Sequence, residues 1–232
     1  MVPIEDIPVL DPAACADVRN RVHALRGHWV RRHPIFPFFT LGTAAYLDAT
    51  RGPAPYVAGA RRTNPVLREH FADLQAAVEA ALALRLGGPV ATTDPRARPG
   101  FHVYLAHPAF AQDLASIHFD TQYRLVPWDD APPTSAAVWS FTLAIALPRA
   151  GAGLVLWDVD HSELPAVGRR PLREVLAERG RTVHEYRLGH LALHDGHTLH
   201  QAAPARAIHE GDERVTLQGH ARPRAGGWEI YW

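Results

Sequence analysis

The spacing of apolar residues changes near position 100, from a helical period to a strand period. In the first part, two stretches place apolar side chains at three- and four-residue steps, which puts them on one face of a helix. Asp-Pro and Asn-Pro precede these stretches and two glycines follow the second, as is typical of helix ends. The predicted helices run from Asp11-Pro12 to about residue 29, from Asn64-Pro65 to Gly87-Gly88 and, in a shorter form, near residues 41–50.

Beyond residue 100, short runs of β-branched, aromatic and aliphatic residues are separated by Gly, Pro and Asp. Apolar residues alternate from Trp139 to Leu147, which predicts a strand with one apolar face. The predicted strands are 101–106, 117–123, 138–147, 153–159, 182–188, 190–194, 213–220 and 228–232, with a short helix near 171–179. Helices followed by strands favour an α+β fold whose β part is a sandwich or a barrel.

Length and charge limit the kind of protein and partner. A chain of 232 residues is long enough for one buried core, and we expect a single domain over 1–232. In it, 1–99 would be mainly helical support and 100–232 the β core. Lys plus Arg and Asp plus Glu number 24 each, so no net field attracts nucleic acid or an anionic membrane. We therefore expect a small-molecule partner.

Cysteine content and the N-terminal residues indicate the compartment. Cys15 is the only cysteine, which excludes an internal disulfide and a zinc cluster of thiolates. The first residues lack the basic start and apolar run of a signal peptide, and no stretch is apolar enough to span a membrane. These features predict a cytoplasmic protein.

His118 and Asp120 are separated by one residue, a spacing found in metal sites. The chain has 15 histidines and 24 acidic residues, so about one or two such pairs are expected by chance. The second pair, His161 and Glu163, lies in a passage that we interpret as an exposed loop. On a strand or at its end, His118 and Asp120 would point to the same side and could bind one ion.

A third ligand and a cation follow later in the chain. Residues 194–204 contain three histidines, of which His200 comes just after a turn. Arg214 follows fourteen residues later, with Thr216 on the same face of a predicted strand. Two imidazoles and one carboxylate suit Fe(II) in oxygenases, because three coordination positions stay open. A guanidinium beside a hydroxyl suits the far carboxylate of a dicarboxylic co-substrate.

In this order, the residues resemble the motif of the Fe(II)/2-oxoglutarate-dependent dioxygenase superfamily. That motif is H-x-D, a long gap, a second histidine, and then R-x-[ST]; here it matches His118-x-Asp120, His200 and Arg214-x-Thr216. Residues 142–158 and 188–204 are similar to the hairpin and the histidine-bearing segment of the family. The resemblance implies a double-stranded β-helix (jelly-roll, cupin-like) core over roughly 100–232, with the N-terminal helices as support.

The resemblance also implies a set of roles. His118, Asp120 and His200 would bind Fe(II), and Arg214 and Thr216 would bind 2-oxoglutarate, with O2 as the further co-substrate. Tyr104 matches a position that often contacts the co-substrate in this family. The enzyme would hydroxylate or desaturate a small substrate, amino-acid-like or a natural-product intermediate, and release succinate and CO2. Because related halogenases replace the carboxylate with a small residue, Asp120 favours hydroxylation over chlorination.

Other interpretations stay open at this point. A cupin-like hydrolase, isomerase or sugar-binding module could use the same ligands with Zn or Mn, and would not need Arg214. A binding protein without catalysis would need no metal. His197 is the reserve for His200 as third ligand, and Gln122, Trp139 and Trp157 are weaker candidates for the substrate pocket. The remaining histidines are interpreted as packed or surface residues, namely His102, His107, His184, His190, His194, His209 and His220.

Overall fold

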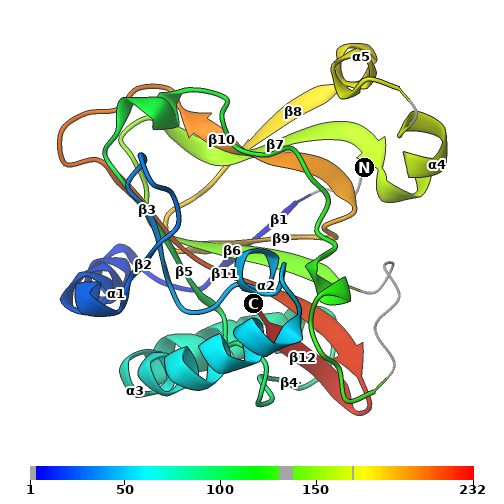
Figure 1. Cartoon of the computed structure of the whole chain (residues 1–232). Coiled ribbons are helices and arrows are strands. Elements are labelled where there is room, and N and C mark those ends of the chain that lie inside the picture. The colour runs from blue at the N-terminus through cyan, green and yellow to red at the C-terminus, as the bar shows by residue number, and fades with distance from the viewer. Residues whose placement is uncertain (1–3, 131–137, 169) are drawn as a thin grey trace.

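Two β-sheets face each other in the computed structural model, which describes residues 4–130, 138–168 and 170–232 (Figure 1). Within these residues the larger sheet has nine strands, paired along the path β1-β9-β6-β11-β5-β3-β2, with β12 joining β11 to β4. Its strands are β1 (Glu5–Pro8), β2 (Val30–Arg31), β3 (Phe38–Leu41), β4 (Val90–Ala91), β5 (Gly100–Leu105), β6 (Trp139–Ala146), β9 (His190–His194), β11 (Glu213–Arg224) and β12 (Gly227–Tyr231). The smaller sheet has the order β10-β7-β8 and consists of β7 (Gly151–Asp160), β8 (Arg181–Glu185) and β10 (Thr198–Ala205).

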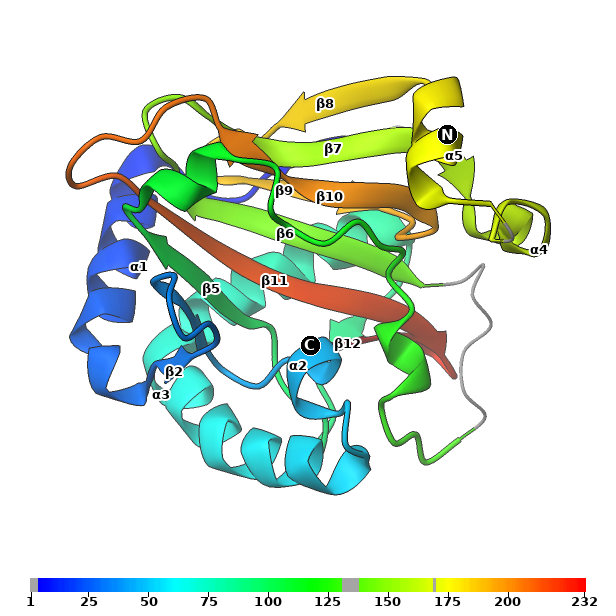
Figure 2. The same cartoon turned by 45° about the horizontal axis from the view of Figure 1, so that its top comes forward.

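Two of the helices, α1 and α3, cover the outer face of the larger sheet (Figure 2). The α-helices are α1 (Pro12–Ala24), α2 (Ala45–Asp48), α3 (Pro53–Leu86), α4 (Leu164–Val167) and α5 (Leu172–Glu178). Short 3-10 helices are η1 (Arg26–His28), η2 (Pro108–Ala111), η3 (Gln122–Arg124) and η5 (His161–Glu163). Figure 2 shows α1 and α3 on the side of the larger sheet that faces away from the smaller one. This arrangement leaves the inner face of the larger sheet free to form a site.

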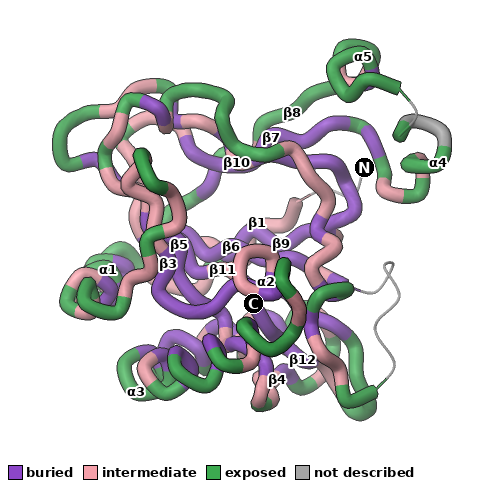
Figure 3. Tube along the Cα trace, viewed as in Figure 1, coloured by how far each residue is buried: buried purple, intermediate pink, exposed green. Residues whose placement is uncertain are grey.

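The main hydrophobic core lies between the larger sheet and these two helices. Val22 of α1 and Leu67 and Phe71 of α3 pack in one cluster with Leu143 of β6 and Leu217 of β11. All of these side chains are buried. Figure 3 shows the strands of the larger sheet as mostly buried, whereas α4, α5 and much of β8 are exposed.

The α+β fold with a double-stranded β-helix core is confirmed, and so are most of the predicted elements. α1 begins after Asp11, whose carboxylate accepts a hydrogen bond from the Ala14 amide at 2.8 Å. α3 ends at Gly87, which adopts φ +73°. Such a left-handed residue ends many helices and favours glycine. The prediction of a single domain over 1–232 stays a prediction.

The predicted start of the long helix is wrong. α3 begins at Pro53, so that Pro65 lies inside it, and Phe71 departs from helical geometry. Asn64 is not a helix cap. Its side-chain amide donates to the Arg96 carbonyl at 2.8 Å, and its side-chain oxygen accepts from the Arg98 amide at 3.0 Å. The Asn-Pro pair that indicates a helix start is used here for a tertiary contact.

The predicted strand over 117–123 is also wrong, and a strand at β10 was not expected. His118 forms only an isolated bridge to His200, and η3 follows at Gln122. β10 contains Pro204, a residue that weakens a strand prediction. Because β10 is at the edge of its sheet, the proline costs no pairing inside the sheet.

Across the described ranges, the structure contains no helix that is both long enough and apolar enough to cross a membrane.

A buried ion cluster attaches the segment after His118 and Asp120 to the larger sheet. Glu229 of β12 accepts from the Arg96 Nε at 2.5 Å and from the Arg222 Nη2 at 2.7 Å. All three side chains are buried. The Arg222 guanidinium lies 4.0 Å from the ring centre of Trp128, and the two arginines also pair with Asp129 and Asp130. Residues 128–130 are therefore anchored by charge and by stacking.

Glu229→Gln should lower the free energy of unfolding by about 3 kcal/mol, because it leaves two buried guanidinium groups with one fewer charged partner. Urea denaturation followed by circular dichroism measures the change. The control is Glu185→Gln, which breaks an exposed pair with Arg206 and should change stability by less than about 0.5 kcal/mol. Equal effects of the two substitutions would contradict this account.

Candidate active site

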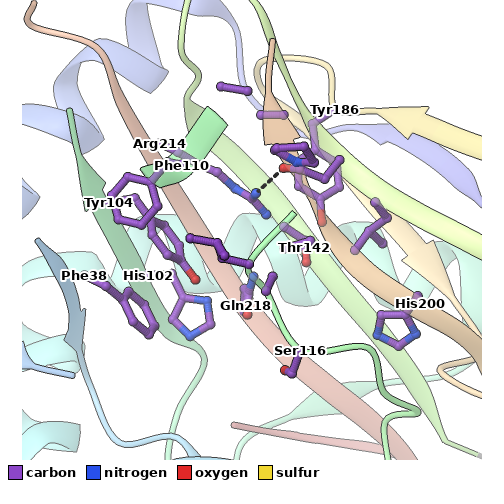
Figure 4. A pocket seen from close by; sticks show the side chains of 18 of the residues that line it. Phe38, His102, Tyr104, Phe110, Ser116, Thr142, Tyr186, His200, Arg214 and Gln218 are labelled. Carbon is purple, nitrogen blue, oxygen red and sulfur yellow. Dashed lines mark hydrogen bonds between the residues drawn. The ribbon is translucent and has the colours of Figure 1, made fainter. Parts of the chain in front are cut away.

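A cavity of about 540 Å³ lies between the two sheets. Strands β5, β6 and β11 of the larger sheet, strands β7 and β10 of the smaller sheet, and the chain over 109–122 all contribute lining side chains. Figure 4 shows part of this lining, with Arg214 and Tyr186 at one end and His200 at some distance from them.

Three potential metal ligands meet in this cavity. The imidazoles of His118 and His200 and the carboxylate of Asp120 place ligand atoms within 4.8 Å of one another. No other group of this kind occurs in the part of the chain that the structure describes. The Nε2 of His118 is 3.6 Å from one carboxylate oxygen, and the Nε2 of His200 is 3.4 Å from the other. The three groups can therefore bind a single ion.

Backbone hydrogen bonds bring the three residues together. His118 and His200 exchange two of them, amide to carbonyl, at 2.9 and 3.0 Å. The Asp120 amide donates to the Gly196 carbonyl at 2.8 Å, which attaches the same segment to the turn before β10. Gly196 has φ +67°, and a Cβ at this position would lie 2.8 Å from the Asp120 Cβ. Glycine is required at this turn for both reasons.

Further hydrogen bonds orient the ligand atoms. The Nδ1 of His118 lies 3.0 Å from the Ser116 carbonyl, and the Nδ1 of His200 lies 2.8 Å from the Thr198 carbonyl. A carbonyl only accepts, so each Nδ1 carries the proton and each Nε2 has a free lone pair. The Gln122 amide donates to Asp120 at 2.8 Å and fixes the carboxylate. This is the usual arrangement around metal-binding imidazoles and carboxylates.

The charges of the trio favour a cation. Burial raises the pKa of the Asp120 carboxyl, but His200, His220 and His118 together more than offset it and hold that pKa well below its usual range. For His200, burial lowers the pKa and Asp120 raises it, with a net increase. Burial lowers the pKa of His118. An ionised carboxylate beside two imidazoles is a donor set that suits Fe(II), and the residues fit the group that the resemblance implies.

Arg214 lies in the same cavity and has a guanidinium with spare hydrogen-bond donors. Its Nη1 donates only weakly to the Ala203 carbonyl, at 3.4 Å, and its buried Nε has no partner among the described residues. The guanidinium is 5.6 Å from the ring centre of Tyr104 and 5.3 Å from that of Tyr186. Burial raises the pKa of Tyr104 to about 12, so its hydroxyl is neutral. Arg214 is therefore available to an anionic ligand.

The structure does not bring Thr216 to the cavity surface. Its side chain is fully buried, and its hydroxyl accepts a weak hydrogen bond from the Gln218 amide at 3.4 Å. Gln218 is on the same face of β11, two residues further along, and lines the cavity instead. Tyr104 does line it, as does Gln122, whereas Trp157 packs in a separate cluster and Trp139 packs on the main core.

The rival histidines lie elsewhere. His161 and Glu163 are in η5, where Glu163 pairs with Arg179. The ring centres of His197 and His161 are 6.1 Å apart, and His197 is not among the residues that line the cavity. The predicted exposed loop is thus a short helix, in which the Glu163 carboxylate pairs with a neighbouring arginine.

Three histidines line the cavity, although the sequence predicted that they were packing or surface residues: His102, His194 and His220. His102 is 2.6 Å from the Tyr46 hydroxyl, and the ring of His194 is 5.0 Å from that of His200. Burial lowers the pKa of both His102 and His194 to about 3, so both are neutral. Their place on inner faces of β5, β9 and β11 depends on strand pairing, for which the isolated sequence contains no signal.

Comparisons with known proteins support the fold. No protein-family model matches the chain, and no curated protein matches it in sequence. Among solved structures, the chain is similar to an N-substituted L-amino acid dioxygenase from Burkholderia ambifaria, with 17% identity, 82% of this chain and 73% of that chain covered, and a TM-score of 0.51. It is also similar to AviO1 from Streptomyces viridochromogenes, with 16% identity, 96% and 90% covered, and a TM-score of 0.53.

The chain therefore has the fold of the Fe(II)/2-oxoglutarate-dependent dioxygenases, as the sequence resemblance predicted.

His200→Ala should weaken the binding of Mn(II) by about 100-fold or more, because it removes one of three ligand atoms. His197→Ala is the matched control, because His197 lies three residues earlier in the turn before β10, and it should leave the affinity within about twofold. Isothermal titration calorimetry measures the Mn(II) affinity of both folded variants. If folded His200→Ala binds Mn(II) as tightly as the unmodified protein, the ion is bound elsewhere.

Proposed function

We propose that the protein is an Fe(II)/2-oxoglutarate-dependent oxygenase that hydroxylates or desaturates a small molecule. The observation that carries this proposal is that a metal-binding trio and an arginine with unused donors open into one cavity. The fold that the chain shares with a dioxygenase supports it. The metal-binding trio or the arginine alone would fit several functions, but together they fit a metal and an anionic co-substrate.

The trio would hold the iron. His118 and His200 would donate through Nε2, and Asp120 would supply a carboxylate oxygen. Three protein ligands leave coordination positions for a co-substrate and O2. When bound, iron with 2-oxoglutarate and O2 supplies an oxidant for a C–H bond, and succinate and CO2 are the co-products.

Arg214 would bind the far carboxylate of 2-oxoglutarate. A guanidinium matches both oxygens of a carboxylate, and the buried Nε of Arg214 has no partner until such a ligand binds. Tyr104 and Tyr186 flank the guanidinium with their rings. Gln218 and Thr142 line the cavity between Arg214 and the metal ligands, where they can donate to a bound ligand (Figure 4). The chain's part is to position these groups and exclude solvent.

A cupin-like zinc or manganese protein would use the same three ligands. It would leave the unused donors of Arg214 unexplained. We therefore retain it only as the outcome to exclude, together with a binding protein that needs no metal.

Arg214→Ala should weaken 2-oxoglutarate binding by about 100-fold, because a charge-assisted pair in a buried site is lost. The metal should still bind. Anaerobic titration of the Fe(II)-loaded protein, followed through its metal-to-ligand charge-transfer absorption band, measures the affinity. Arg206→Ala, at an exposed pair with Glu185, is the control and should bind normally. No 2-oxoglutarate band in the unmodified protein would refute the proposal, and an unchanged affinity in Arg214→Ala would refute the role of this residue.

Asp120→Ala should reduce oxygen-dependent succinate formation to below about 1% of the unmodified protein, because the carboxylate ligand is lost. Asp113→Ala alters an exposed carboxylate nearby and should keep full activity. Circular dichroism verifies folding of both variants. Undiminished succinate formation by folded Asp120→Ala would remove this residue from the proposed site.

A further inference from the structure

One side of the cavity is formed by six aromatic rings, which we call the aromatic wall. Its members are His33, Phe36, Phe38, His102, Tyr104 and Phe110, and all six line the cavity. Figure 4 shows Phe38, His102, Tyr104 and Phe110 together on one side and His200 on the other. The wall therefore stands opposite a proposed iron ligand.

The rings contact one another in a continuous series. Phe36 stacks on His33 at 4.2 Å between ring centres and reaches Phe110 at 6.2 Å. Phe110 meets Tyr104 edge-on at 5.1 Å, and Tyr104 stacks on Phe38 at 4.4 Å. Ring faces and edges in such an array are the usual partners of another aromatic ring.

Backbone pairing holds this wall in place before any ligand binds. Phe38 of β3 pairs directly with Tyr104 of β5, so both side chains leave the same face of the sheet. The Nδ1 of His33 accepts from the Phe36 amide at 3.0 Å and fixes the loop before β3. Rings that are already ordered lose little entropy when a ligand stacks on them.

The cavity has little capacity for a second negative group. Among the described lining residues Arg214 is the only arginine, and the chain contains no lysine. His102 is neutral, since burial, Arg214 and Arg32 lower its pKa to about 3. If Arg214 binds the co-substrate, a carboxylate or phosphate on the substrate would be buried without a permanent cation. That burial is strongly unfavourable.

A positive group on the substrate is also disfavoured. Asp212 and Glu213 line the cavity, but Asp212 pairs with Arg149, and Glu213 pairs with Arg19 and His23. The remaining carboxylate, Asp120, belongs to the proposed metal site. The cavity thus offers no free counter-ion of either sign among its described lining residues.

We propose that the substrate of this oxygenase is an uncharged molecule with a flat aromatic ring that stacks on the aromatic wall. This inference rests on the proposed function, because it assumes that 2-oxoglutarate occupies Arg214. The proposal excludes free amino acids as substrates when their ionised carboxylate would lie inside the cavity. The Burkholderia ambifaria dioxygenase of similar fold is described as acting on N-substituted L-amino acids, so the two proteins would differ in substrate.

Three bicyclic probes test the proposal without turnover. The protein is loaded anaerobically with Fe(II) and saturating 2-oxoglutarate, and 2-naphthamide, 2-naphthoate and decahydronaphthalene-2-carboxamide are titrated by calorimetry. 2-Naphthamide should bind at least about tenfold tighter than the naphthoate, because the latter carries an unpaired charge. It should bind at least about threefold tighter than the saturated amide, which cannot stack.

Two leucine substitutions locate the binding surface. Phe36→Leu removes one ring of the wall and should weaken 2-naphthamide binding at least about threefold, while binding of the saturated amide stays the same. Phe39→Leu is the matched control, since Phe39 points to the other side of the sheet and meets Trp29 at 5.5 Å between ring centres. It should change neither affinity.

The inference is wrong if the naphthoate or the saturated amide binds as tightly as 2-naphthamide, or if 2-naphthamide does not bind at millimolar concentration. The preceding 2-oxoglutarate titration reports separately on the oxygenase assignment. Normal 2-oxoglutarate binding with no preference among the probes would overturn the substrate class alone.

Discussion

The backbone bridge between His118 and His200 is the contact on which the proposed site depends. These residues are far apart in the sequence, and neither belongs to the larger sheet. Two reciprocal hydrogen bonds between them, and a third from the Asp120 amide to Gly196, attach the chain over 118–120 to β10. With this segment attached, the ligand atoms of His118, Asp120 and His200 lie within 4.8 Å of one another. The ligand geometry is thus a property of the backbone, with side-chain hydrogen bonds refining it.

The larger sheet allows such a polar site to form within a stable protein. Its outer face packs against α1 and α3 in a continuous apolar cluster, so its inner face is not needed for that core. The inner face instead carries buried polar residues, among them His102, Thr142 and His220. Each has found at least one partner or faces the cavity, as buried polar groups must. The ion cluster around Glu229 likewise gives each of its buried charges a partner.

Few charged groups in the cavity lack a partner, and this links the proposed chemistry to the proposed substrate. The trio can attract a metal ion because Asp120 stays ionised, and Arg214 can attract a carboxylate because its donors are not used. Other charged lining residues are already paired. What remains is aromatic surface, which discriminates by shape and stacking and not by charge. In the proposed assignment the two ionic positions would serve the cofactors, and the wall would be left for the substrate.

The sequence by itself determined the periodic elements and the order of the chemical groups. Helix and strand periods follow from residue spacing, which is local, and the motif of His118, Asp120, His200 and Arg214 follows from identity and order. Only the tertiary structure decided that Asn64 caps no helix, that residues 198–205 pair as β10, and that His118 meets His200 through a single bridge. It also decided that Gln218 and not Thr216 reaches the cavity, and that Phe36, Phe38 and Phe110 meet in one wall. Such outcomes depend on which strands pair and which side chains compete for one space, and both are long-range properties that no local pattern contains.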